Sequence, residues 1–180
     1  MSDVAVRPLG EDDWQDFRGI RLEALAESPD AFASGYAEEE AYDEDFWRLR
    51  LRRSARLVAE APDGRLLGLV NVGQARGEEG PVPEIAEIFG LWVRPEARGT
   101  GVATMLVEAG ARQARSEGKS HIAYWVGTDN GRAVAFASGM GFRPTDYRRA
   151  MRSPSGEESG EQEIAMTLPL GADRGAGFRL

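Results

Sequence analysis

EIFGLWVRPEARGTGVATMLVEAGARQARS, residues 87–116, is the stretch around which the rest of the chain is organised. Its apolar run at residues 88–93 has the length of a buried strand, a turn follows at residues 94–96, and the end has the apolar spacing of an amphipathic helix. The first turn of a helix carries N–H groups without internal partners and a partial positive charge. A strand, a glycine-containing turn and a helix start therefore predict a site that holds an anion.

The turn between strand and helix is suited to phosphate. Gly99 and Gly101 remove side-chain bulk, so a phosphate can approach the backbone. Arg98 adds a planar fork of donors that matches phosphate oxygens. A dinucleotide site of the G-x-G-x-x-G type fits poorly, because Thr104 replaces the third glycine and no strand-end acid follows at the usual distance. A tight turn that binds no ligand is the other alternative.

Composition narrows the class of protein. The 180 residues suffice for one domain with a core, and 42% apolar with 29% charged residues describe a globular protein. The absence of cysteine excludes disulfides, thiolate metal sites and a cysteine nucleophile. No apolar run reaches the length of a membrane span, no signal peptide is evident, and a net charge of −8 argues against nucleic acid as a partner. We expect a cytoplasmic protein with neither a membrane nor a nucleic-acid partner.

Local patterns predict an α/β fold with a mixed sheet flanked by helices, in the order β-α-α-β-β-β-α-β-α-β-β. Strands are expected at residues 3–9, 56–60, 66–74, 88–93, 120–126, 142–151 and 163–170, and helices at 12–27, 46–53, after 101 and at 130–140. Arg21 falls among the apolar positions of the first helix. Polar loops are expected at residues 77–83 and 153–160. Residues 1–170 are expected to form one domain and residues 171–180 a flexible tail.

The loop also fills the signature Arg/Gln-x-x-Gly-x-Gly/Ala completely, with Arg98-Gly99-Thr100-Gly101-Val102-Ala103. Preceded by Leu91-Trp92-Val93, it resembles the acyl-CoA loop of the GNAT superfamily of N-acetyltransferases. The element order of that fold covers most of the chain. Further matches are Glu87, six residues before Val93, the run Asn130-Gly131-Arg132-Ala133 followed by Gly141-Phe142, and a closing strand at residues 163–168.

The resemblance implies acetyl-CoA as cosubstrate, lying in a cleft between the central strand and the strand at residues 120–126. The backbone of Leu91, Trp92 and Val93 would pair with pantetheine, and the N–H near Val93 would polarise the thioester carbonyl. Asn130 and Phe136 would flank the far arm of the cosubstrate. The pyrophosphate would be held by the loop residues Arg98, Gly99, Thr100, Gly101, Val102 and Ala103.

Acetyl transfer to an amine requires a base, because an alkylammonium has a pKa near 10.4 and no lone pair. Glu87 is the expected general base, acting through a water molecule. The alternative is a salt-bridged or solvated glutamate at the start of a strand.

One position departs from the family pattern. Many members carry a tyrosine that protonates the departing CoA sulfur, and Ala137 stands at that position here. Tyr124 and Tyr147 are substitutes, although each also fits a packed aromatic of the sheet. A thiolate is a tolerable leaving group at neutral pH, so the loss of the acid would slow the reaction without preventing it.

The acceptor side is predicted from the segment between the first two helices, which forms a wall of the acceptor pocket in this family. Phe32, Tyr36 and the run Glu38-Glu39-Glu40 would suit a small cationic amine such as a polyamine, while a solvated charge run is the alternative. His121, the only histidine, is expected to be structural. Without cysteine and with one histidine, no metal site is expected.

Two functions from different classes remain. The first is an acetyl-CoA-dependent N-acetyltransferase acting on a small-molecule amine, a protein N-terminus or a lysine, with Glu87 as its main support. The second is an acyl-CoA sensor or partner module that binds the cosubstrate but turns over weakly, with Ala137 as its support. A nicotinamide-dependent dehydrogenase would instead bind NAD. Dimers are frequent in the superfamily, so the resemblance also implies a homodimer.

Overall fold

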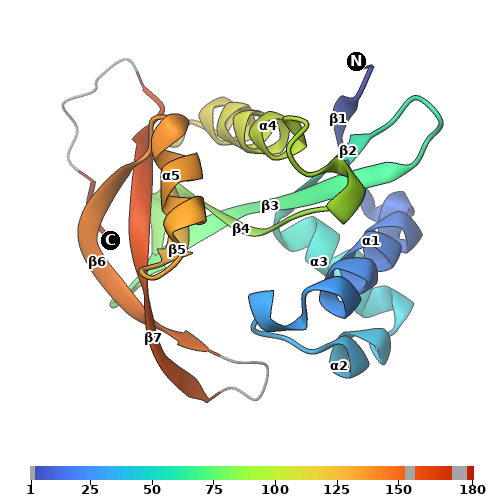
Figure 1. Cartoon of the computed structure of the whole chain (residues 1–180), viewed down its shortest axis with the longest axis horizontal. Helices are drawn as coiled ribbons and strands as arrows, with labels where there is room; N and C mark the ends of the chain where they lie inside the picture. The colour runs from blue at the N-terminus through green and yellow to red at the C-terminus, as the bar shows by residue number, and fades with distance from the viewer. Residues whose placement is uncertain (1–2, 153–156, 172–177) are drawn as a thin grey trace.

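A computed structural model describes residues 3–152, 157–171 and 178–180 of the chain. Its core is a seven-stranded sheet with the strand order β1-β2-β3-β4-β5-β7-β6. Helices cover both faces of the sheet (Figure 1). The elements are β1 (Ala5–Pro8), α1 (Trp14–Glu27), α2 (Tyr36–Glu40), α3 (Glu44–Arg53), β2 (Ala55–Glu60), β3 (Leu66–Gly77), β4 (Gly80–Val93), α4 (Val102–Ser116), β5 (His121–Gly127), α5 (Gly131–Gly139), β6 (Arg143–Arg152) and β7 (Glu158–Pro169), with short 3₁₀ turns at Glu11–Asp13, Pro29–Ala31 and Pro95–Ala97. The mixed α/β architecture is therefore confirmed.

The junction between β4 and β5 differs from every other junction in the sheet. It is the parallel pair of the sheet, and its register covers Ile85 with His121 through Ile88 with Tyr124. All other neighbours are antiparallel. Beyond Ile88 and Tyr124 the two strands are not paired, and β5 turns away with β7 and β6 (Figure 1). The edge of β4 that follows residue 88 is thus left open toward β5.

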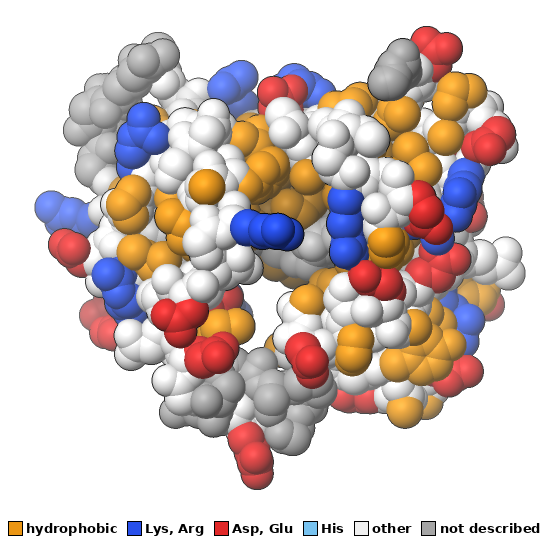
Figure 2. Space-filling model, in the orientation of Figure 1, with side chains coloured by type: hydrophobic (Ala, Val, Ile, Leu, Met, Phe, Trp, Pro, Cys, Tyr) orange, Lys and Arg blue, Asp and Glu red, His pale blue; other side chains and the backbone are white. Residues whose placement is uncertain are grey.

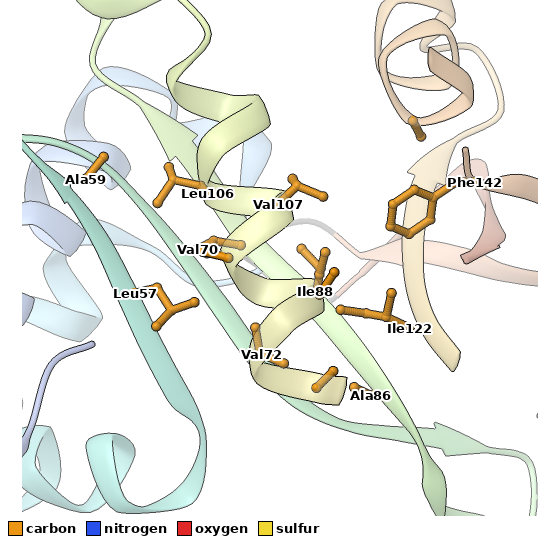
Figure 3. Close-up of a cluster of buried hydrophobic side chains, with 14 of the residues drawn as sticks. Leu57, Ala59, Val70, Val72, Ala86, Ile88, Leu106, Val107, Ile122 and Phe142 are labelled. Carbon is orange, nitrogen blue, oxygen red and sulfur yellow. The ribbon is translucent and has the colours of Figure 1, made fainter. Parts of the chain in front are cut away.

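Helix α4 packs across one face of the sheet at this junction. Leu106 and Val107 point from α4 onto Val70, Val72 and Ile88 of the central strands (Figure 3). Gly110 allows the helix to approach closely, because a Cβ atom added there would lie 3.2 Å from Val72 Cγ2. Close packing of these apolar side chains fixes the start of α4 beside the open edge of β4.

Helices α1 and α3 cover the opposite face through a second core. Phe17 and Trp47 meet edge to face with their ring centroids 5.4 Å apart. They pack with Leu25, Leu69 and Trp92, which are buried. The segment that links α1 to α3 lies over the same face of β4 and contributes to the acceptor side described below.

Several boundaries differ from the sequence prediction. Residues 77–83 were expected to form a loop, but β3 and β4 continue through them as a hairpin that pairs Ala75 with Val82 and Gly77 with Gly80. Backbone pairing across this hairpin outweighs the glycines and prolines that indicated a loop. Helix α2 was not predicted, because five residues give too short a periodic pattern. Strand β7 begins at Glu158, five residues before the predicted start, and part of the expected loop at 153–160 lies outside the described residues.

The end of the chain is held against the sheet. Residues 171–180 were expected to form a flexible tail, and residues 172–177 lie outside the described part. Phe178 and Leu180 nevertheless pack on Ala75, Ile85 and Ala123 of the face that carries Glu87. The ring of Phe178 lies 5.7 Å from that of His121, so the single histidine has the structural surroundings expected of it. This end of the predicted tail is therefore anchored.

Candidate active site

A cleft of about 520 Å³ opens where β4 and β5 separate. Figure 2 shows the molecule hollowed between the lobe of α5, β6 and β7 and the lobe of α1 and α2, with apolar side chains inside and Lys or Arg side chains at the rims. Residues from six segments of the sequence line the cleft, among them Arg21, Phe32, Phe89, Trp125, Arg149 and Glu163.

The loop before α4 leaves main-chain donors unused. Gly99 has φ 77° and Gly101 has φ 91°, a left-handed conformation that favours glycine, and nothing lies within 4 Å of a Cβ atom added at either position. Among the residues that the structure describes, the N–H groups of residues 99–103 have no acceptor. The Thr100 hydroxyl donates to the Ala97 carbonyl, and this hydrogen bond stabilises the turn. Five free amides at the start of a 15-residue helix fit an anion such as a pyrophosphate.

Arg98 is held by its neighbours in this loop. Its Nε donates to the Val93 carbonyl at 3.0 Å, and its Nη2 donates to Glu27 Oε2 at 2.8 Å. The same carboxylate accepts from the Trp92 indole N–H at 2.9 Å. Hydrogen bonds from Ser28, Trp92 and Arg98 lower the pKa of Glu27 to about 2. Arg98 is thus oriented beside the loop, with a side chain that is about half exposed.

The three residues before the turn alternate between the two faces of the sheet. Val93 packs with the α4 core, and so does Leu91, whereas Trp92 packs with the α1 core. The Arg94 N–H donates to the Leu67 carbonyl on β3. Since N–H groups alternate along a strand, the Val93 N–H points to the other edge, toward the opening between β4 and β5.

A bulge in β4 lies at the floor of the cleft. Gly90 has φ 59°, and the register between β3 and β4 shifts between Leu69 and Asn71. Asn71 Nδ2 donates to the Phe89 carbonyl at 3.0 Å, and Asn71 Oδ1 accepts from Arg56 Nη1 at 2.6 Å. Asn71 and Arg56 are both buried. Burial, with the repulsion of nearby Arg50 and Arg21, lowers the pKa of Arg56 to about 9.

Glu87 is not among the residues that line the cleft, but it is joined to one that does, Arg149, in an ion-pair network. Arg149 Nη1 is 3.4 Å from Glu87 Oε1, and Arg149 Nε donates to Glu163 Oε1 at 3.0 Å. The Arg149 guanidinium also stacks on Trp125, with Cζ 4.2 Å from the ring centroid. Burial raises the pKa of Glu87 above its ordinary value, although the charge of Arg149 opposes the rise. Glu87 is therefore easier to protonate than a surface glutamate.

The residues predicted to flank the far arm lie on α5. Asn130 caps this helix, because its Oδ1 accepts from the Ala133 N–H at 3.1 Å. Phe136 lines a separate groove between α4 and α5. Ala137 is buried in the core, and Tyr124 lines the main cleft. Burial raises the pKa of Tyr124, so its hydroxyl stays protonated at neutral pH.

The structure brings only part of the predicted acceptor wall into the cleft. Phe32 lines it, whereas Tyr36 is exposed on α2 and is not among the lining residues. Glu39 is buried and paired, with Arg21 Nη2 at 2.9 Å and Arg50 Nη1 at 2.7 Å. Glu38 accepts from the Tyr42 hydroxyl at 3.0 Å. The acidic run is thus divided between ion pairs and the surface.

Sequence reasoning missed three residues that line the cleft, Arg21, Arg149 and Glu163, and one that supports its floor, Asn71. Arg149 and Glu163 meet because β6 and β7 place them opposite each other, a register that is not visible in the sequence. Asn71 on β3 donates a side-chain hydrogen bond to the Phe89 carbonyl on β4, a contact between two strands that the sequence pattern does not indicate. Arg21 alone gave a signal, since an arginine within an apolar helical stripe indicates a buried charge with a specific partner.

The described residues contain neither a metal-ligand cluster nor a helix that could span a membrane. No group of three or more His, Asp or Glu residues there could hold a metal ion. None of the helices in the described ranges is both long and apolar enough to cross a membrane.

Comparison with known proteins identifies the family. Residues 21–142 match the model of the Acetyltransferase (GNAT) family, and the chain belongs to this family. The mycothiol acetyltransferase of Paenarthrobacter aurescens is 34% identical over 86 residues, which are 48% of this chain and 26% of that protein. An uncharacterised N-acetyltransferase of Archaeoglobus fulgidus is 28% identical over 155 residues, which are 86% of this chain and all of that protein. The matched region thus spans about a quarter of the length of the mycothiol enzyme.

Solved structures share the fold at low identity. A GNAT-family acetyltransferase from Streptococcus pneumoniae superposes with a TM-score of 0.73 at 15% identity, covering 94% of this chain and 100% of that one. YncA of Salmonella typhimurium, solved with its cofactor acetyl-CoA, gives a TM-score of 0.69 at 19% identity and covers 95% and 96% of the two chains. The predicted GNAT fold is confirmed.

Proposed function

We propose that this protein transfers the acetyl group of acetyl-CoA to a primary amine. The observation that carries the proposal is the set of unpaired amides at residues 99–103, which lies at one end of the β4–β5 opening. Glu87 lies on β4, the strand that precedes this loop. Membership of the GNAT family and the acetyl-CoA found with YncA support the choice of cosubstrate.

The loop has the donors that acetyl-CoA needs. In this proposal residues 98–103 hold the pyrophosphate through their amides, with Arg98 beside them. The open edge of β4 at Leu91, Trp92 and Val93 pairs with the pantetheine amides. The Val93 N–H, which points into the opening, stabilises charge on the thioester oxygen. We assign Asn130 and Phe136 to the walls of the far arm on the family resemblance.

Glu87 is proposed as the general base. Acetyl-CoA supplies the acetyl group as a thioester, and the amine nitrogen forms the new C–N bond as the C–S bond breaks. Glu87 accepts the proton that the ammonium loses, through a water molecule, and its raised pKa moves its basicity toward neutral pH. Arg149 holds the carboxylate in place. Tyr124 lines the cleft with a protonated hydroxyl and is the proposed proton donor to the departing sulfur, in place of the absent tyrosine at position 137.

A weakly active acyl-CoA-binding module is the second candidate. Ala137 favours it, since the usual proton donor of the family is replaced by a buried methyl group. Both candidates bind acetyl-CoA, so binding alone does not separate them.

The deciding experiment measures release of free CoA thiol across a panel of primary amines. We expect turnover by the wild type, and a fall in kcat of about 10²- to 10⁴-fold for Glu87→Gln with acetyl-CoA affinity retained. The rise of kcat with pH should also flatten in this variant. The matched control is Glu84→Gln, which changes an exposed glutamate three residues earlier on the same strand. If none of the amines gave thiol release, the result would support the binding module, and a wild-type pH profile for Glu87→Gln would remove Glu87 from the mechanism.

The assembly and location of the protein are also proposals. By analogy with its family we propose a homodimer in the cytoplasm, which size-exclusion chromatography with light scattering and cell fractionation would test.

A further inference from the structure

The side of the cleft formed by β4, β6 and β7 carries an excess of negative charge. Glu163 lines the cleft, and Glu87 contacts Arg149, which also lines it; the side chains of Glu87 and Glu163 are 14% and 20% exposed. Arg149 is the cation that contacts both, and its own side chain is 47% exposed. Two carboxylates against one partly solvated guanidinium leave this side able to attract a further cation, such as the ammonium group of an acceptor.

The α1 side of the cleft has the opposite excess. Arg21 lines the cleft, and Arg50 and Arg56, which do not line it, lie near one another and near Arg21. Among the described residues, Glu39 is the one carboxylate that forms an ion pair with any of the three. Arg56 hydrogen-bonds instead to Asn71, which is neutral. Asp30 also lines the cleft, but it is exposed at the rim, where water screens its charge. This cluster of three arginines therefore carries two positive charges more than its paired carboxylate balances, and Arg21 is the member that lines the cleft.

Arg21 presents one unused donor group to the cleft. It is 9% exposed, and its Nε and Nη2 donate to the two oxygens of Glu39 at 3.0 and 2.9 Å. Its guanidinium is stacked on Phe32, with Cζ 4.6 Å from the ring centroid. The ion pair with Glu39 and the stacking on Phe32 together fix the plane of the Arg21 guanidinium group. Nη1 has no acceptor in the described part of the chain, and it lies beside the bulge, 3.5 Å from where a Cβ atom of Gly90 would be.

We propose that the acceptor is a small amino carboxylate, such as a free amino acid, whose carboxylate binds Arg21 Nη1 while its amine faces Glu87 and Glu163. This inference rests on the proposed acetyl transfer and names its substrate class. A fixed guanidinium that still has donors available binds a carboxylate with directed, charge-assisted hydrogen bonds. A cleft that is positive on one side and negative on the other is complementary to a molecule with both charges.

The structure argues against the polyamine suggested by the acidic run. Such a polycation would need carboxylates on the side that receives its second charge. Glu39 is already paired with two arginines, and Glu38 is hydrogen-bonded to Tyr42 at the surface. A second ammonium group in the cleft would meet Arg21 instead.

The test compares each standard amino acid with its carboxamide in the thiol-release assay. The carboxamide keeps the amine and removes the negative charge. We expect the wild type to prefer at least one amino acid to its amide by about tenfold or more in kcat/KM. Arg21→Gln should lower kcat/KM for that amino acid by about tenfold or more and change kcat/KM for the amide by less than about threefold.

Two further variants control this test. Arg18→Gln removes an arginine from the same helix that donates to the Glu40 carbonyl at 3.2 Å and does not line the cleft, and it should keep the wild-type preference. If Arg21→Gln does not fold because Glu39 loses a partner, the double variant Arg21→Gln with Glu39→Gln removes the pair together and should show the same loss of preference.

The outcomes separate this inference from the proposed function. Turnover of amides as fast as of the acids, or an equal loss for both in a folded Arg21 variant, would refute the carboxylate site and leave acetyl transfer standing. The absence of thiol release with every acceptor would refute the proposed function and this inference with it.

Discussion

The loop at residues 98–103 and the floor of the acceptor side are both polar, but they are made from different groups. Main-chain N–H donors form the loop, and two glycines at positive φ aim them. Side chains form the acceptor floor, through a chain of contacts from Glu39 to Arg21 and from Arg56 to Asn71. The loop should therefore tolerate many changes of side chain but few changes of backbone conformation. The floor should depend on each named side chain.

A change of backbone conformation should give the largest effect. Gly101→Ala places a Cβ atom at φ 91°, which costs about 1–2 kcal/mol or forces the turn to shift. Since the free amides would shift with it, we expect acetyl-CoA affinity to fall about a hundredfold, measured by calorimetry.

The control for this change is Gly118→Ala, at the other end of α4. Gly118 has φ 77° and the same open surroundings, so the strain is similar but the site is remote. It should lower the melting temperature as Gly101→Ala does while leaving acetyl-CoA affinity unchanged. Equal affinities for the two variants would contradict the assignment of the loop.

Removal of one side chain should destabilise the acceptor floor without affecting the loop at residues 98–103. Asn71→Ala deletes the donor to the Phe89 carbonyl and leaves buried Arg56 without its acceptor. We expect the free energy of unfolding to fall by about 2–3 kcal/mol, measured by urea denaturation, with acetyl-CoA affinity largely retained. Gln74→Ala, an exposed position on the same strand, should change it by less than about 0.5 kcal/mol. A large loss of acetyl-CoA affinity in Asn71→Ala would show that the two regions are not independent.

Acid should weaken the same floor by a smaller amount. Burial opposes the ionisation of Glu39, but the hydrogen bonds and charges of Arg21 and Arg50 outweigh it and lower the pKa from 4.5 to about 2. An acid whose pKa is lowered on folding stabilises the protein above its unfolded pKa and loses this contribution as the pH falls toward the folded value. The stability advantage of the wild type over Glu39→Gln should therefore shrink by about 1–2 kcal/mol between pH 7 and pH 3.

This measurement also has a neighbouring control. Glu40→Gln changes the next residue, which is exposed, and should show no such change between the two pH values. If the advantage of the wild type over Glu39→Gln stayed constant with pH, the two arginines would not hold the carboxylate ionised.

The difference between the two regions also explains what the sequence could predict. The strand, turn and helix that make the loop are contiguous within residues 87–116, so local pattern sufficed for the fold and for the placing of the loop. The hairpin at residues 77–83 was missed because strand pairing decides it, and helix α2 because five residues give too short a periodic pattern. On the acceptor side, the contact between Arg149 and Glu163 depends on the register of β6 with β7. The contact of Asn71 with β4 depends on the bulge in that strand. Such contacts join distant segments, and no local periodicity encodes them.

The short pairing of β4 with β5 has a consequence for how such a sheet diversifies. In the described part of the chain, the strand pairing that joins the first four strands to β5, β7 and β6 runs from Ile85 to Ile88. Acceptor-side residues that lie on the outer three strands, such as Arg149 and Glu163, can therefore change without disturbing the register that supports the loop. A lineage built on this plan is free to exchange one chemical target for another while keeping the same acyl donor.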